Sequence, residues 1–172
     1  MTTLSKLRLV ILLLVLGSTV GCDQASKHFA RTGLGPRGAV ALPGGFGELR
    51  LAENPGSFLS LGAALPERLR LMCFVVGVST GLMILSVYLI RNAGVGWLQF
   101  AGLALVAAGG LSNLIDRITR HGLVTDFIFL RVGPLHTGIF NLADVMIMLG
   151  VALLLGTMWQ KKATGPRISR SS

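Results

Sequence analysis

Four apolar runs divide the chain, and each is long enough to cross a membrane. Leu71–Ile90 is a run of twenty residues without a charge, and about 20 residues at a rise of ~1.5 Å span the hydrocarbon core of a bilayer. Val95–Ile115 and Phe140–Trp159 are similar in length, and Leu9–Cys22 reaches it when extended through the following DQASKHFA. We therefore predict an all-α membrane protein with four transmembrane helices, at approximately residues 8–29, 70–90, 95–116 and 140–160.

The first run has a second interpretation. Lys6 and Arg8 precede its apolar body, and small residues lead up to Cys22, which is the layout of a secretory signal whose cysteine receives lipid. Thr19 is a poor match for the large aliphatic residue usual three positions before such a cysteine, and the rest of the chain is itself apolar. We favour a retained first span.

The segments between the runs, approximately residues 30–69 and 117–139, are predicted to lie outside the bilayer. From Arg31 to Pro66 glycine and proline are too frequent for a membrane helix. Within this region GAVAL and ELRLAEN flank PGGFG, which predicts a small extracytoplasmic β-hairpin with one apolar face. That face could contact lipid or a substrate. We also expect the glycine-rich loop from Arg31 to Leu65 to move and close over a substrate.

Composition supports one integral membrane domain over residues 1–172, because 52% of the residues are hydrophobic and only 13% are charged. The net charge of +9 is scattered and forms no basic, aromatic-interleaved face, which argues against nucleic acid. It suits helix ends that contact membrane lipids. Neither the two cysteines nor the three separated histidines have the spacing of a metal site, so we expect no metal and no cofactor.

Four spans put both termini on one side of the membrane. Short segments on that side carry seven basic residues near the spans, which favours cytoplasmic termini under the positive-inside rule. The ends of the spans that face the two long loops would then lie on the outer side.

Polar residues gather at these outer ends, where charge is costly. Asn113, Asp116 and Arg117 share one face of the third helix by their spacing, and Asn141 and Asp144 begin the fourth. Asp23 and Lys27 lie four apart near the outer end of the first, as an ion pair or an interfacial anchor. A polar network between helices is predicted.

Asp126 is an isolated acid in the β-branched and aromatic segment GLVTDFIFLRV, which predicts a strand or extended loop. If the turn from Gly133 to Gly138 folds back, Asp126 meets Asp144. Two close carboxylates share a proton and can activate water for peptide hydrolysis. The residues alone leave two rivals open, a small ion or proton transporter and a structural subunit whose acids only join helices.

Five motifs, DQASK, ENPG, GGLSNLIDR, HGLVTDFI and FNLAD, occur in an order and spacing that resemble the lipoprotein signal peptidase family. The resemblance implies that Asp126 and Asp144 are catalytic. It also implies supporting roles for Asp23, Lys27, Asn54, Gly56, Asn113, Asp116, Arg117, Asn141 and Ala143.

The same resemblance implies a protein of the bacterial inner membrane that acts as a prolipoprotein endopeptidase without metal. It implies cleavage before a diacylglyceryl-modified cysteine and inhibition by the cyclic peptide globomycin. We expect a monomer. Two positions depart from the family pattern: the segment after Asn54 reads Pro55, Gly56, Ser57, Phe58, Leu59, which displaces an aromatic residue by one, and Ser112 replaces a glycine.

Overall fold

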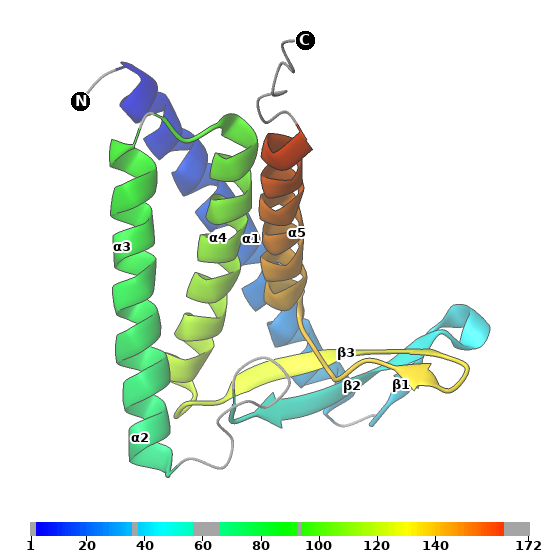
Figure 1. Ribbon diagram of the computed structural model, residues 1–172. Helices are drawn as coiled ribbons and strands as arrows, with labels where there is room; N and C mark the ends of the chain where they lie inside the picture. The colour runs from blue at the N-terminus through cyan, green and yellow to red at the C-terminus, as the bar shows by residue number, and fades with distance from the viewer. Residues whose placement is uncertain (1–2, 36–37, 57–65, 93, 164–172) are drawn as a thin grey trace.

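The computed structural model describes residues 3–35, 38–56, 66–92 and 94–163. Four helices long and apolar enough to cross a membrane stand together as a bundle, and a small antiparallel sheet lies across one end of it (Figure 1). The predicted class, four transmembrane helices with a small β module, is confirmed. Ser57, Phe58 and Leu59, with the rest of the predicted mobile loop up to Leu65, lie outside the described residues.

Helix α1 covers Thr3–Leu34. The second span begins as the short helix α2, Glu67–Leu71, continues as a π-helical segment, Met72–Gly77, and becomes α3, Val78–Arg91. Helix α4 covers Trp97–Thr119, and α5 covers Leu142–Ala163. Helix α4 packs against α1, α3 and α5 and is the most buried of the four, so it forms the centre of the bundle. The outer faces of the other helices remain apolar and exposed, as lipid contact requires.

The first helix is longer than predicted, because the segment from Arg31 to Leu34 continues it instead of starting the loop. The extension is stabilised by packing: Ala30 and Leu34 bury against Phe127, which belongs to the sheet. Arg31 also donates a hydrogen bond to Thr125 Oγ1 at 3.0 Å. Tertiary contact thus overrides the helix-breaking signal of the glycines that follow.

The sheet has the order β1-β2-β3-β4. Strand β1, Val40–Ala41, and strand β2, Gly47–Asn54, form the predicted hairpin around a single 3₁₀ turn, Pro43–Gly45. Strand β3, Val124–Val132, pairs with β2, and β4, Leu135–His136, turns back on β3. The register of β2 against β3 shifts between Leu49 and Ala52, which marks a bulge in the pairing. Two loops that are distant in sequence therefore build one sheet.

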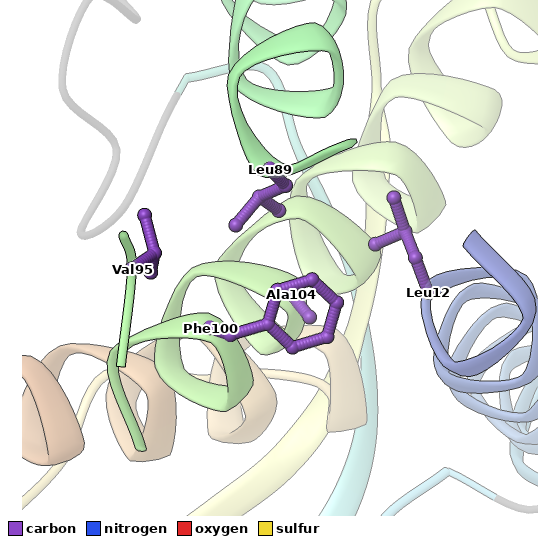
Figure 2. Packing of buried hydrophobic residues seen from close by; sticks show 5 residues of the cluster. All are labelled: Leu12, Leu89, Val95, Phe100 and Ala104. Carbon is purple, nitrogen blue, oxygen red and sulfur yellow. The ribbon is translucent and has the colours of Figure 1, made fainter. Parts of the chain in front are cut away.

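At the end of the bundle opposite the sheet, Leu12, Leu89, Val95, Phe100 and Ala104 form a buried cluster that joins α1, α3 and α4 (Figure 2). The guanidinium of the buried Arg8 donates to the carbonyl oxygens of Asn92 and Val95 in the α3–α4 connection. It also lies over the rings of Trp97 and Phe100. These contacts fix the turn between α3 and α4 to the first helix.

Small residues bring α4 and α5 into backbone contact. A Cβ atom on Gly102 would lie 2.9 Å from the carbonyl oxygen of Gly150, and one on Gly109 would lie 2.4 Å from that of Ala143. The four-residue spacing of Gly77 and Gly81 in the second span predicts a pair of small residues that packs against another helix. That prediction is wrong, since a Cβ on either would have no atom within 4 Å. Among the described residues, no helix packs against the face of the second span that carries them.

Replacing Gly150 by alanine should destabilise the bundle by roughly 1–3 kcal/mol, because the new Cβ would lie 2.5 Å from the carbonyl oxygen of Gly102. Gly156→Ala, on the same helix with nothing within 4 Å, is the matched control and should be neutral or slightly stabilising. Thermal unfolding of the two purified variants in the same detergent measures the difference. Equal melting temperatures would contradict the close packing.

Candidate active site

The ammonium group of Lys27 is the centre of the polar network where α1, α4 and α5 meet the sheet. Its side chain is fully buried, and Nζ lies 2.7 Å from Asp23 Oδ2 and 3.0 Å from Asp116 Oδ2. Nζ also donates to Asn113 Oδ1 at 2.8 Å. An ammonium has three donors, so all of its hydrogen-bonding capacity is used within the protein. Lys27 is therefore an interhelical anchor and not an interfacial one.

Gln24 and Ser112 complete this network, and neither was predicted to support the site. Ser112 Oγ donates to Asp23 Oδ2 at 2.7 Å, and Gln24 Nε2 lies 3.0 Å from Asp116 Oδ1 and 3.1 Å from Ser112 Oγ. Ser112 is fully buried, so the hydroxyl that replaces a family glycine is used as a hydrogen-bonding group. The position of Gln24, on the α1 face that also carries Asp23 and Lys27, was the available signal.

The motif FNLAD folds as the N-terminus of α5. Asn141 Oδ1 accepts from the backbone N of Asp144 at 3.0 Å, and Asp144 Oδ2 accepts from the backbone N of Asn141 at 3.2 Å. This reciprocal arrangement is a capping box, in which the N-cap residue and the third helical residue satisfy each other's free N–H groups. The backbone N of Ala143 donates to Asp23 Oδ1 at 2.8 Å. The helix start thus fixes the Asp144 carboxylate and places it in the favourable field of the helix N-terminus.

Asp126 reaches the same point from strand β3. The preceding residue anchors the strand, because the backbone N of Thr125 donates to Asp116 Oδ2 at 3.0 Å. Asn141 Nδ2 then donates to Asp126 Oδ1 at 2.7 Å, and Asn54 Nδ2 donates to Asp126 Oδ2 at 2.9 Å. Each oxygen of the Asp126 carboxylate therefore has an amide donor.

Two amide side chains link the two carboxylates. Asn113 Nδ2 donates to Asp144 Oδ1 at 2.9 Å, and Asn113 Oδ1 accepts from Asn141 Nδ2 at 3.2 Å. The same Nδ2 group of Asn141 donates to Asp126. A change in the position of either carboxylate would thus be transmitted to the other through Asn113 and Asn141.

Arg117 fixes the turn that carries Asn54. Its Nη2 donates to the carbonyl oxygen of Gly56 at 2.8 Å, and its Nη1 donates to that of Asn113 at 3.2 Å. Asn54 Oδ1 accepts from the backbone N of Gly56 at 2.9 Å, which is an Asx turn. The guanidinium also lies 5.1 Å from the ring centroid of Phe74 in the π-helical segment. Arg117 therefore connects α4, the β2 end and the second span.

Both carboxylates line a cavity of about 820 Å³ between the sheet and the helices. Asn54, Asn113 and Arg117 line its polar end with them. Its apolar wall continues along α5 and is formed by Val145, Ile147, Met148, Leu149 and Ala152. A ligand in this cavity would contact charge at one end and hydrocarbon over the rest.

Burial raises the pKa of Asp126 from 3.8 to about 6. The hydrogen bond from Asn54 acts in the opposite direction, and the negative charge of Asp144 adds to the rise. Near neutral pH the pair therefore holds a proton more readily than two exposed carboxyls would. Such a pair can both donate and accept a proton.

All eleven residues that the sequence singled out lie in or beside this network. Asp126 and Asp144 line the cavity, and the supporting residues hold them through the contacts described above. Within the described part of the chain, no group of three or more His, Cys, Asp and Glu side chains is placed to hold a metal ion. Two linked carboxylates that line one cavity are suited to acid–base chemistry.

Replacing Lys27 by methionine should destabilise the protein by roughly 3–5 kcal/mol, because Asp23 and Asp116 would keep buried charge without a cation. Arg50→Met removes an ion pair with Glu48 that is partly exposed, and should cost at most about 1 kcal/mol. Chemical or thermal unfolding in detergent compares the two. A similar small loss for both would show that Lys27 is not the anchor.

The raised pKa of Asp126 predicts how stability depends on pH. The folded protein binds this proton more tightly than the unfolded chain, so the stabilisation is fully present below pH 3.8 and is lost as pH rises to about 6. The loss amounts to about 3 kcal/mol. Melting temperatures of the wild type and Asp126→Asn between pH 4 and 8 test this, since the variant lacks the titration. A constant difference across that range would contradict it.

Comparison with known proteins shows which family this chain resembles. The model of the family described as signal peptidase (SPase) II matches residues 11–160. The lipoprotein signal peptidase of Syntrophus aciditrophicus is 33% identical over 91% of this chain and 97% of its own length. That of Moorella thermoacetica is 37% identical over 88% of this chain and 90% of its own length.

Solved structures agree on the fold. One structure of a bacterial membrane enzyme superposes with a TM-score of 0.75 at 21% identity over 94% of both chains. A second gives 0.74 at 24% identity over 86% of this chain and 92% of the other. The family model and the sequence matches show that this bacterial multi-pass membrane protein belongs to the signal peptidase II family.

Proposed function

We propose that this chain is an aspartic endopeptidase that removes the signal peptide of prolipoproteins, cleaving before the diacylglyceryl-modified cysteine. The observation that carries the proposal is the pair formed by Asp126 and Asp144. Two carboxylates from different elements are joined through Asn113 and Asn141 and line one cavity beside the apolar wall of α5. Membership of the signal peptidase II family supports the same reaction.

In the proposed reaction Asp126 carries the shared proton and Asp144 the negative charge. Asp144 accepts a proton from a water molecule as the water oxygen bonds to the scissile carbonyl carbon, and Asp126 donates its proton to the carbonyl oxygen. The resulting gem-diol collapses when Asp144 passes its proton to the peptide nitrogen and Asp126 recovers one from a hydroxyl. The C–N bond breaks, which leaves a carboxylic acid on the signal peptide and a free amine on the cysteine.

The amide groups that hold Asp126 and Asp144 allow these proton transfers to occur without movement of either carboxyl group. The capping box holds Asp144 at the start of α5, and the amide donors on Asp126 leave its carboxyl one orientation relative to the cavity. Preorganised donors require little rearrangement as charge develops. Lys27, Asp23 and Asp116 act at a distance by holding the three helices and β3 in register.

The apolar wall along α5 would contact the lipid-bearing part of the substrate or the hydrophobic body of its signal peptide. The same cavity would accommodate a globomycin-type cyclic peptide. We expect the chain to act as a monomer without a cofactor.

The proposed location is the bacterial inner membrane with both termini cytoplasmic. The start of α1 and the end of α5 lie at one end of the bundle, and the sheet with the carboxylate pair lies at the other (Figure 1). The pair would then face the outer side. Of the acids that a transporter would use, Asp116 lies in the last turns of α4, Asp144 in the first turn of α5 and Asp126 on β3. None of the three lies midway along a span, which disfavours the transporter alternative.

Asp126→Asn and Asp144→Asn should each reduce processing at least ~100-fold, because each removes the proton-transfer group of one step. Glu48→Gln, a partly exposed acid on the same sheet, is the control and should process normally. A gel-shift assay with a lipidated preprotein measures cleavage, and recovery from membranes with a cooperative melting transition confirms folding. Undiminished cleavage by either aspartate variant would exclude the dyad.

A further inference from the structure

Two buried acids outside the candidate dyad hold its members through the residue that precedes each. Asp23 Oδ1 accepts a hydrogen bond from the backbone N of Ala143 at 2.8 Å, at the start of α5. Asp116 Oδ2 accepts one from the backbone N of Thr125 at 3.0 Å, on β3. In both cases the next residue is a candidate catalytic aspartate. A rotation of either buried carboxylate would therefore move one member of the dyad relative to the other.

Each of these two carboxylates also accepts a hydrogen bond from a neutral side chain on the opposite helix. Ser112 Oγ, on α4, donates to Asp23 Oδ2, on α1, at 2.7 Å. Gln24 Nε2, on α1, donates to Asp116 Oδ1, on α4, at 3.0 Å. The two donors also contact each other, because Gln24 Nε2 lies 3.1 Å from Ser112 Oγ. Gln24 and Ser112 are thus a crossed pair, in which each helix supplies the donor for the acid of the other.

The crossed pair determines which oxygen of each acid faces the dyad. In Asp23, both Lys27 and Ser112 bind Oδ2, which leaves Oδ1 to accept from the start of α5. In Asp116, Gln24 binds Oδ1, while Oδ2 accepts from Lys27 and from β3. An ammonium is a compact point charge, so Lys27 alone would neutralise either carboxylate without selecting one of its oxygens. The neutral donors make that selection.

Neither member of the crossed pair contacts the reacting atoms. Ser112 is fully buried on α4, and neither side chain lines the cavity that contains the dyad. Loss of either donor would leave a buried carboxylate oxygen with fewer hydrogen bonds than it can accept, and the carboxylate would turn to recover them. That movement would reach the dyad only through the backbone of α5 or β3.

We infer that Gln24 and Ser112 are positioning residues for the proposed peptidase reaction. Ser112 acts through the carboxylate of Asp23 on the start of α5, and Gln24 acts through that of Asp116 on β3. The crossed pair thereby sets the position of one candidate catalytic aspartate relative to the other. Its effect on turnover rests on the proposed function, whereas its effect on the two anchored backbone N–H groups rests on the fold alone.

Ser112→Ala and Gln24→Met remove one donor each and test the inference in the full chain, purified in detergent. Cleavage of a lipidated preprotein should show kcat reduced at least about 10-fold, because small displacements of catalytic groups are costly. KM should stay within about twofold, since the lining of the cavity is unchanged. Leu89→Ala is the control: it removes a fully buried side chain at the opposite end of the bundle, and should lower the melting temperature but not kcat. All variants are assayed well below their melting temperatures.

Hydrogen exchange of the same proteins gives a readout that does not require turnover. Ser112→Ala should accelerate exchange at the backbone N–H of Ala143 more than at that of Thr125, by at least about threefold. Gln24→Met should show the reverse order, and Leu89→Ala should change neither. If the wild type did not cleave the preprotein, the proposed function would fail, but these exchange rates would still decide whether the crossed pair anchors α5 and β3.

Unchanged exchange at both N–H groups would overturn the inference. So would a loss of kcat no larger than that of Leu89→Ala, which would assign Gln24 and Ser112 to stability alone. A rise in KM with kcat unchanged would assign them to substrate binding and would equally contradict a positioning role.

Discussion

The bundle depends on one buried cation. Lys27 has no contact with water, so its charge is tolerable only because Asp23, Asp116 and Asn113 each accept one of its protons. The three acceptors belong to two helices, and the two carboxylates continue the network to α5 through the backbone of Ala143 and to β3 through that of Thr125. Lys27 does not contact Asp126 or Asp144. The hydrogen bonds and ion pairs that neutralise its charge nevertheless determine where these two carboxylates lie.

The elements of the site differ in how they are held. Asp144 is fixed locally by the capping box, which needs only the four residues of the helix start. Asp126 is fixed from a distance, by amides on β2 and at the start of α5 and by the anchoring of its neighbour to α4. A substitution in the sheet should therefore affect Asp126 more than Asp144. The two carboxylates are coupled mainly through Asn113 and Asn141.

The periodicity of hydrophobic residues and the free-energy cost of burying polar groups were sufficient to predict the four spans, the hairpin and the polar face of α4. Within the spans, a polar residue is informative because lipid offers it no hydrogen bond. The same reasoning could not find Ser112, since small hydroxyl residues are common in membrane helices and its partner Asp23 lies on another helix. It overlooked Gln24, although the position of Gln24 on the same α1 face as Lys27 was a signal. It also misplaced the end of α1, which is set by packing on Phe127. The glycine pair of the second span had the right spacing but no helix opposite it.

The backbone contacts between α4 and α5 have a consequence for movement. Gly102 meets Gly150 and Gly109 meets Ala143, at points seven residues apart on each helix. Two contacts without room for a methyl group fix the axial register of the pair, so neither helix can slide along the other by a fraction of a turn. Asn113 on α4 and Asp144 on α5 consequently keep a fixed position relative to each other. The second span has few buried residues, and part of the sheet extends sideways past α5 (Figure 1). These two parts are therefore the ones expected to move when a bulky ligand enters.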